Sequence, residues 1–429
     1  MKKYLLFIVF ILTLLNNNFA QSQTSRSLVK ILQSGKQDPV LKKVLDDTAT
    51  YKVQIIYTEI TRNNKNLPSF KNHYFNYDPN LYFNPASIVK LPIALLALEK
   101  LQDLRQYGVD RNTTMLFDSA YERQVPFHFD STSEDGNPSI GHFIKKIFLI
   151  SDNDAYNRLY QFVGHEAIHN LLDKKGYGTV LIPRQFMGFT EEQNKRSNPV
   201  KFTNAKGEII YQQPMLVSEK ELNFPRNIKV GKGFMRSGQL VNEPFDFTRH
   251  NYMSLADMQI MLQSVIFPES VPAERRFNID EDDRRFLLKF LSQYPSETDY
   301  PKYDTEKFFD SYAKFFFRPA PIPESIRVFN KTGWAYGYLT DISYVLDYKN
   351  NIEYMLSATV YTNSDGILND GKYDYEDVGY PFLFALGQKI LFHENSKKKK
   401  HKADFSDLII QYDKRDPNDT RPSITEADN

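Results

Sequence analysis

The chain has 429 residues, of which 41% are apolar and 14% aromatic, and it contains no cysteine. This composition excludes disorder as the main state and allows one large core or two modest ones. The net charge of +1 gives no global reason to expect a nucleic acid as partner. Without cysteine, disulfides, thiol chemistry and lipid attachment through a cysteine are also excluded.

The first twenty residues have the layout of a cleavable secretory signal. A basic start is followed by an apolar run from Leu5 to Leu15 and a polar stretch that ends in Ala20. The apolar run is short for a bilayer span. We therefore expect residues 1–20 to be removed, leaving a secreted or periplasmic protein without a stable membrane anchor. An uncleaved anchor is the alternative.

Two strands and a long helix are predicted after a polar, helix-prone segment at 27–47. Alternating β-branched and aromatic residues at 51–60 and the aromatic stretch at 72–80 are typical of a hairpin. From about Ser87 to Gln106 the apolar residues recur at helical spacing. That spacing predicts a helix with one buried face.

A helical middle and a second group of strands follow. Further helices are predicted at 139–150, 167–176, 254–267 and 282–294. Three strands are then predicted at 326–333, 341–348 and 352–361, with a hairpin turn at 349–351 and a last amphipathic helix at 380–393.

This order predicts an α/β (α+β) fold, in which an antiparallel sheet takes strands from both ends of the chain and a helical lobe is inserted between them. We expect one catalytic domain over 21–396. Its sheet lobe would comprise about 45–80 and 325–393, and its helical lobe about 81–324, with an insertion at about 197–253 that contains a hairpin at 201–213. The charged segment 397–429, which opens with KKKKHK, is expected to be a solvated tail.

The sequence SIVK places Ser87 and Lys90 one turn apart at the start of the first long helix. A lysine so placed lies on the same helix face as the serine, and partial burial would lower its affinity for a proton. A neutral amine beside a hydroxyl can serve as a base beside a nucleophile. The pattern S-x-x-K is weak alone, because it also occurs at Ser27, Ser311 and Ser396. An N-terminal serine with a snorkelling lysine is the alternative.

Two further motifs follow in order. The sequence SDND at 151–154 lies between two predicted helices, where Ser, Asp and Asn are also common as caps. The sequence KTG at 331–333 ends a predicted strand, where its glycine could form a bulge or turn. Three such motifs in order, each in its required structural context, are rare by chance.

With these three motifs the chain resembles the penicillin-recognising serine hydrolases, and particularly class A β-lactamases. The stretch KTGWAYGYLTDISYV and the helix VGHEAIHNLLDKKGYGT extend the resemblance, which covers roughly residues 45–393 without the insertion. It implies a β-lactamase/transpeptidase-like fold with the site between the two lobes.

The resemblance also implies roles for individual residues. Ser87 would be the nucleophile, Lys90 its activating base and Ser151 the proton relay to the leaving nitrogen. Asn153 would hold the substrate amide, while Lys331, Thr332 and Gly333 would form the strand that binds the substrate carboxylate. The N–H groups of Ser87 and Trp334 would form the oxyanion hole.

The expected function is hydrolysis of β-lactam amides or related cell-wall peptides by a monomeric exported enzyme, with a role in antibiotic resistance. No metal or organic cofactor is implied, and no nucleic acid. A DD-peptidase or penicillin-binding protein with slow deacylation is the first alternative. A non-catalytic module that binds cell wall or senses β-lactams is a second.

The family's deacylating glutamate is missing from its usual pattern. Class A enzymes carry E-x-x-x-N in the loop after S-D-N, whereas this chain offers Glu191 and Glu192 close to Asn194 at other spacings. Either carboxylate could activate water, but both could be solvated loop residues.

The sequence HEAIH at 165–169 raises a competing hypothesis of a zinc protease. Its His165, Glu166 and His169 match H-E-x-x-H, and Glu191 could be a third ligand. However, Gly164 predicts that the helix begins at His165, whereas zinc-binding histidines lie inside a helix. Histidines at a helix boundary are therefore the favoured interpretation.

Overall fold

The computed structural model describes residues 22–36, 38–224 and 226–426. The predicted signal at 1–20 lies outside the described residues. Within the described ranges, no helix has the length and apolar character needed to span a bilayer.

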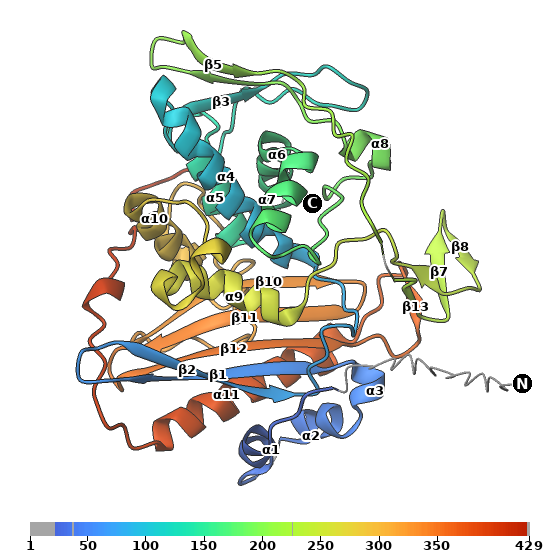
Figure 1. Ribbon diagram of the computed structural model, residues 1–429, viewed down its shortest axis with the longest axis vertical. Helices are drawn as coiled ribbons and strands as arrows, with labels where there is room; N and C mark the ends of the chain where they lie inside the picture. The colour runs from blue at the N-terminus through green and yellow to red at the C-terminus, as the bar shows by residue number, and fades with distance from the viewer. Residues whose placement is uncertain (1–21, 37, 225, 427–429) are drawn as a thin grey trace, which may run out of the picture.

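A five-stranded antiparallel sheet forms the lower half of the molecule, in the order β10-β11-β12-β1-β2. Figure 1 shows its two blue strands from the start of the chain beside three orange strands from near the end. These strands are β1 (Gln54–Arg62), β2 (Pro68–Phe75), β10 (Ile326–Ala335), β11 (Tyr338–Asp347) and β12 (Ile352–Tyr361). The predicted fold class, with a sheet assembled from both ends of the chain, is confirmed.

Both faces of this sheet are covered, because its central strands β11 and β12 are buried at every position. Alternate residues of β1 point to opposite cores: Ile55 and Tyr57 pack among the terminal helices, whereas Ile56 and Ile60 pack against the helical lobe. The terminal helices are α1 (Arg26–Gln33), α2 (Pro39–Asp46), α3 (Thr48–Tyr51) and α11 (Tyr380–Ser396), with the π-turn η6 (Tyr375–Gly379) before α11.

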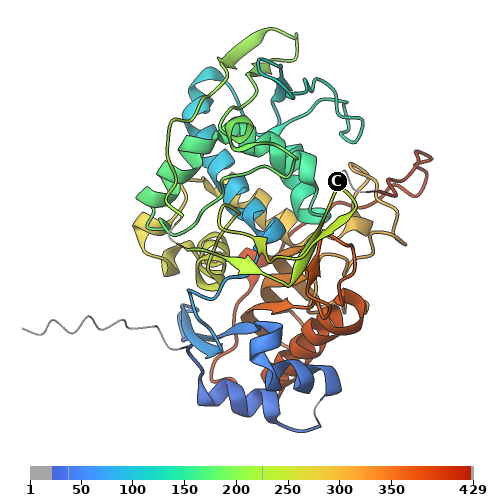
Figure 2. The same ribbon diagram turned by 90° about the vertical axis from the view of Figure 1, so that its right-hand side faces the viewer.

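The helical lobe lies on the other face of the sheet, as Figure 2 shows from the side. Its helices are α4 (Lys90–Leu104), α5 (Ile140–Leu149), α6 (Asn153–Val163), α7 (His165–Lys174), α9 (Leu255–Ile266) and α10 (Glu281–Ser292). Helix α4 is central, since α5, α6, α7 and α9 all pack against it. Every residue from Lys90 to Leu98 is buried, so this helix is covered on all sides and not on one face only.

Short strands elaborate the helical lobe. The predicted hairpin at 201–213 forms strands β4 (Val200–Thr203) and β5 (Ile209–Gln213), which β3 (Thr114–Phe117) extends. The remaining small strands are β6 (Lys229–Val230), β7 (Gly233–Arg236), β8 (Gln239–Val241), β9 (Phe245–Asp246) and β13 (Ile367–Leu368). Because β13 pairs with β7, the insertion is joined to the loop that follows the main sheet.

The expectation of a solvated tail after residue 397 is wrong for the described part of that segment. Phe405 and Leu408 are buried against the main core, and the guanidinium of Arg415 binds three backbone carbonyls of the body. Lys397, at the head of the lysine run, pairs with Glu59 and Glu394. The contacts of Lys397 and Arg415, together with the buried Phe405 and Leu408, therefore hold this segment against the fold.

Candidate active site

Ser87 lies at the junction of the sheet and the helical lobe. It belongs to a short 3-10 helix, η1 (Ala86–Val89), and α4 begins only at Lys90, so the regular helix starts three residues later than predicted. Ala86 has a φ of 44°, a conformation that costs free energy for any residue with a Cβ. Its N–H donates to Oδ1 of Asn84 at 2.8 Å, which holds this strained turn. The backbone at Ser87 is thereby fixed at the mouth of the helix.

Lys90 is fully buried and points toward the SDN loop. Its Nζ donates to Oδ1 of Asn153 at 2.7 Å and to Oγ of Ser151 at 3.3 Å, and it also contacts the Ser151 carbonyl. Burial lowers the pKa of Lys90 to about 7, although the charge of Asp152 opposes that shift. Near neutral pH a large fraction of this amine is therefore uncharged. Within the described part of the chain, no hydrogen bond joins Lys90 to Ser87.

Ser151 directly follows α5 and its C-cap, and has a φ of 67°. Its Oγ accepts a hydrogen bond from Nζ of Lys331 at 2.7 Å, and the same amine donates to the carbonyl of Thr332 at 2.7 Å. Lys331 is buried, and this burial is the main reason why its pKa lies well below the usual value. The nearby charge of Lys90 lowers the pKa further. The hydroxyl of Ser151 thus lies between two buried lysine amines.

Strand β10 brings KTG against the serine turn. A Cβ on Gly333 would lie 2.5 Å from the carbonyl oxygen of Pro85 and 2.9 Å from the amide nitrogen of Ser87. Glycine is required here because of this close approach, and the predicted bulge or turn is absent, since β10 continues through Gly333 to Ala335. The next residue, Trp334, packs its ring against Tyr312 at 6.0 Å between centroids.

Thr332 is buried, with 1% of its surface exposed. Its hydroxyl has no hydrogen-bond partner in the described structure. An unsatisfied buried hydroxyl is costly unless a ligand or water completes it. Beside it lies Lys331, whose amine could neutralise an anion. The pair is therefore suited to receiving a negatively charged group from the cleft.

A cleft of about 700 Å³ opens above these residues, and Ser87, Ser151, Asn153 and Trp334 line it. The sequence predictions missed several of its other lining residues: Arg184, Phe186, His250, Asn251, Lys307, Phe308, Tyr312 and Thr425. They come from loops and from the segment expected to be a tail, where no periodic pattern marks them. Among the described residues that line the cleft, none is acidic.

Phe186 lies where the loop after α7 passes Lys90. Its ring centroid is 5.2 Å from Nζ of Lys90 and 4.6 Å from the ring centroid of Tyr156. The backbone N–H of Phe186 donates to Oδ1 of Asn157 at 2.8 Å, so α6 anchors the loop. An aromatic face therefore covers the side of Lys90 that faces this loop.

The two candidate deacylating glutamates lie outside the cleft. Both are in α8 (Glu191–Asn194), where Glu191 pairs with Arg249 and Glu192 with Arg196, and both are solvent-exposed. Asn194 is buried and accepts a hydrogen bond from the backbone N–H of Gln185 at 2.8 Å. These three residues support the loop and do not reach Ser87.

The HEAIH histidines serve as structural groups: His165 is the first residue of α7, as Gly164 predicts, whereas His169 lies one turn inside the helix. The two nitrogens of His169 are occupied by the carbonyl of His165 and the N–H of Ile182, and His165 bonds Ser218. Burial lowers the pKa of His165 to about 3 and that of His169 to about 4. No group of His, Asp or Glu suited to a metal ion occurs among the described residues. The described residues therefore do not support the zinc-protease hypothesis.

Residues 38–208 match the family model of the Beta-lactamase enzyme family. This range contains Ser87, Lys90, Ser151 and Asn153, and the structure joins it to the KTG strand. The predicted resemblance to the β-lactamase enzymes is confirmed. The match supports a β-lactamase-like hydrolase as the coarse function.

Solved β-lactamase structures are similar to this one over most of their length, at low identity. A β-lactamase from Sphaerobacter thermophilus is 12% identical with a TM-score of 0.44, and the match covers 84% of this chain and 98% of that one. A β-lactamase from Francisella tularensis is 10% identical with a TM-score of 0.46, over 83% of this chain and 99% of that one. No curated protein matches the β-lactamase-like chain by sequence.

Proposed function

We propose that this protein is an exported serine hydrolase of the class A type, acylated at Ser87 by β-lactam amides or D-Ala-D-Ala-like peptides, and that the acyl group leaves slowly. The observation that carries the proposal is the arrangement of two buried lysine amines around the hydroxyl of Ser151; one of them belongs to Lys90, which follows Ser87 by three residues. The signal-like residues 1–20 support export. The enzyme would act as a monomer on a small molecule, without a cofactor.

Acylation would use the proton path that these groups define. Uncharged Lys90 takes the proton of the Ser87 hydroxyl as Oγ attacks the carbonyl carbon, and the resulting oxyanion accepts hydrogen bonds from the N–H groups of Ser87 and Trp334. When the carbon–nitrogen bond breaks, Ser151 donates its proton to the leaving nitrogen. Lys90, whose Nζ is 3.3 Å from Ser151 Oγ, then returns a proton to Ser151.

The substrate carboxylate would bind at the KTG strand. The hydroxyl of Thr332 is free to donate, and a carboxylate bound beside it would favour the protonated, charged form of the buried Lys331 amine. Asn153, which also lines the cleft, would position the substrate amide. Its Oδ1 accepts from Lys90, which leaves its side-chain amide nitrogen for the substrate.

Slow deacylation follows from the surroundings of Lys90. Hydrolysis of an acyl-enzyme needs a base that activates water, and the cleft lining among the described residues holds no carboxylate. Phe186 covers the amine of Lys90, where a loop carboxylate could otherwise hold a water. These observations favour the behaviour of a penicillin-binding protein or DD-peptidase over rapid β-lactam turnover.

The test is to follow the intact mass of the protein over time with a penicillin, beside Ser87→Ala. We expect an adduct of the penicillin's mass that persists long after excess drug is removed, and no adduct on Ser87→Ala. A transient adduct with turnover would instead favour a β-lactamase. The absence of any adduct on folded wild-type protein would contradict acylation altogether.

A further inference from the structure

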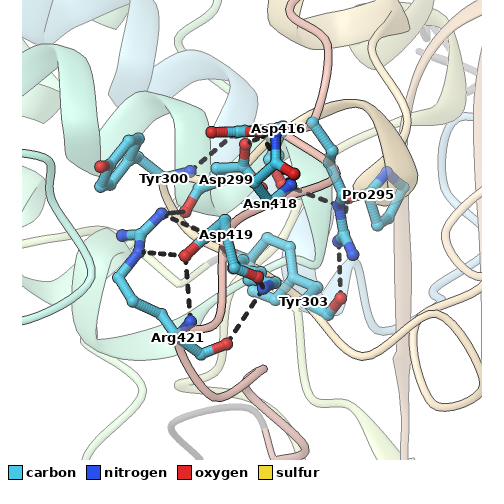
Figure 3. A network of polar contacts seen from close by, with 11 residues as sticks. Pro295, Asp299, Tyr300, Tyr303, Asp416, Asn418, Asp419 and Arg421 are labelled. Atoms are coloured by element: carbon cyan, nitrogen blue, oxygen red, sulfur yellow. Dashed lines mark hydrogen bonds and ion pairs between the residues drawn. The ribbon is translucent and has the colours of Figure 1, made fainter.

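The last described segment of the chain, residues 413–426, folds back onto the loop 295–308 beside the cleft. We call residues 413–426 the clasp. Figure 3 shows the polar network that joins the two, with Asp416, Asn418, Asp419 and Arg421 of the clasp facing Asp299, Tyr300 and Tyr303.

Arg415 is the main anchor of the clasp. Its guanidinium donates to the carbonyls of Thr298 at 3.0 Å, Pro295 at 2.9 Å and Tyr303 at 2.6 Å. Three carbonyls from one loop converge on one cation, which fixes both the loop and the clasp. A neutral side chain at this position would leave these acceptors without their donor.

A second group of contacts lies further along the clasp. The amine of Lys302 donates to the carbonyls of Asp419 at 2.6 Å and Arg421 at 3.0 Å. Arg421 in turn donates to the carbonyl of Asp299 at 3.1 Å, and its guanidinium lies 3.9 Å from the centroid of the Tyr300 ring. Lys302 and Arg421 thus add contacts between the clasp and the same loop that Arg415 anchors.

The end of the clasp reaches the neighbourhood of Ser151. Ile424 pairs in parallel with Tyr303: its N–H donates to the carbonyl of Lys302 at 2.8 Å, and its carbonyl accepts from Asp304 at 2.9 Å. Its side chain packs against a small apolar cluster of Leu149, Ile150, Tyr303 and Phe308. Ile150 directly precedes Ser151, so the clasp supports the element that carries the proton relay.

Thr425, the next residue, lines the cleft together with Lys307, Phe308 and Tyr312. We propose that the clasp forms the cleft wall beside Ser151 and thereby limits the size of the substrate group that can lie there. Thr425 would be a specificity-determining residue, and Arg415 a positioning residue that acts through the loop 295–308.

The substrate group that would lie beside the clasp follows from the proposed function, on which this inference rests. If Ser151 protonates the leaving nitrogen and Thr332 binds the carboxylate, the ring that carries both groups lies against Ile150 and the clasp wall. A bulky substituent on that ring would meet Thr425. A small substituent would pass it.

The test compares two cephalosporins that share one acylamino side chain and differ only in the ring substituent next to the carboxylate, methyl against a bulky group that is not expelled. The measured quantity is the ratio of the acylation rate constants at Ser87, small over bulky, in the full chain. Arg415→Ala should lower this ratio about tenfold by releasing the wall, and Thr425→Trp should raise it about tenfold.

Arg285→Ala, which removes an exposed arginine of α10 that pairs with Glu281, is the matched control and should keep the wild-type ratio. Thr425 is exposed, so Thr425→Trp tests the proposal even if Arg415→Ala fails to fold. A ratio within twofold of wild type in either folded variant would overturn the inference and leave the proposed function intact. Absence of any adduct on wild-type protein would overturn both.

Discussion

The amine of Lys331 lies 2.7 Å from the hydroxyl of Ser151, although 180 positions separate the two residues. This contact joins the KTG strand of the sheet to the SDN loop of the helical lobe. Lys90 approaches the same hydroxyl from α4, so three distant motifs meet at one oxygen atom. Proton transfer to and from Ser151 therefore depends on all three motifs.

Removing the Lys331 amine should slow acylation without unfolding the protein. In Lys331→Ala we expect the acylation rate constant to fall about 100-fold or more, because Ser151 loses its hydrogen-bond donor and the carboxylate site loses its charge. The rate is measured by intact mass against time with a penicillin. Lys314→Ala removes another buried lysine, which does not line the cleft and whose amine bonds the carbonyl of Val328. If both variants were acylated equally slowly, the effect would be one of folding.

Acylation should depend on pH through Lys90. Its pKa of about 7 means that the amine gains a proton as the pH falls below 7 and then can no longer accept the proton of Ser87. We expect the acylation rate constant to rise between pH 5.5 and about 7 and to level off above it. In Lys90→Arg, whose side chain stays charged, acylation should be lost over the whole range. A flat profile in the wild type would argue against Lys90 as the base.

A methyl group on Gly333 should push KTG away from the serine turn. In Gly333→Ala the added Cβ would lie 2.5 Å from the Pro85 carbonyl, so β10 or η1 must move. We expect a destabilisation of about 1–3 kcal/mol by thermal melting, together with a fall in acylation rate of about tenfold or more. Gly178→Ala is the control, because its Cβ would meet only the Asp173 carboxylate at 3.2 Å.

The sequence predicted the fold class and the residues that the structure gathers around Ser151, because both depend on periodic burial and on short ordered motifs. It could not predict that Ser311 and Lys314, another S-x-x-K pair, would also place a buried lysine close to the sheet. The amine of Lys314 donates to the carbonyls of Leu291 and Val328 and to Asn330, which gives it a structural role. Only the three-dimensional contacts distinguish it from Lys90.

The cleft walls were beyond prediction for a different reason. Arg184, Phe186 and Thr425 lie in segments without hydrophobic periodicity, and their place in the cleft depends on contacts across the chain. The charged segment after residue 397 was misjudged because net composition does not reveal that Arg415 has fixed carbonyl partners and Lys397 a fixed carboxylate partner.

Phe186 is expected to be the reason for slow deacylation. Its ring lies 5.2 Å from the Lys90 amine, so a carboxylate placed there could both hold a water and share a proton with Lys90. We expect Phe186→Glu to release the acyl group at least about tenfold faster than wild type, since a positioned general base commonly contributes 10²–10⁴-fold.

The matched control is Phe186→Gln, because a glutamine side chain has nearly the same shape as glutamate but carries no charge. Release is measured as the decay of the penicillin adduct after excess drug is removed. Equal release by the two variants would show that opening the aromatic cover, and not the carboxylate, admits water.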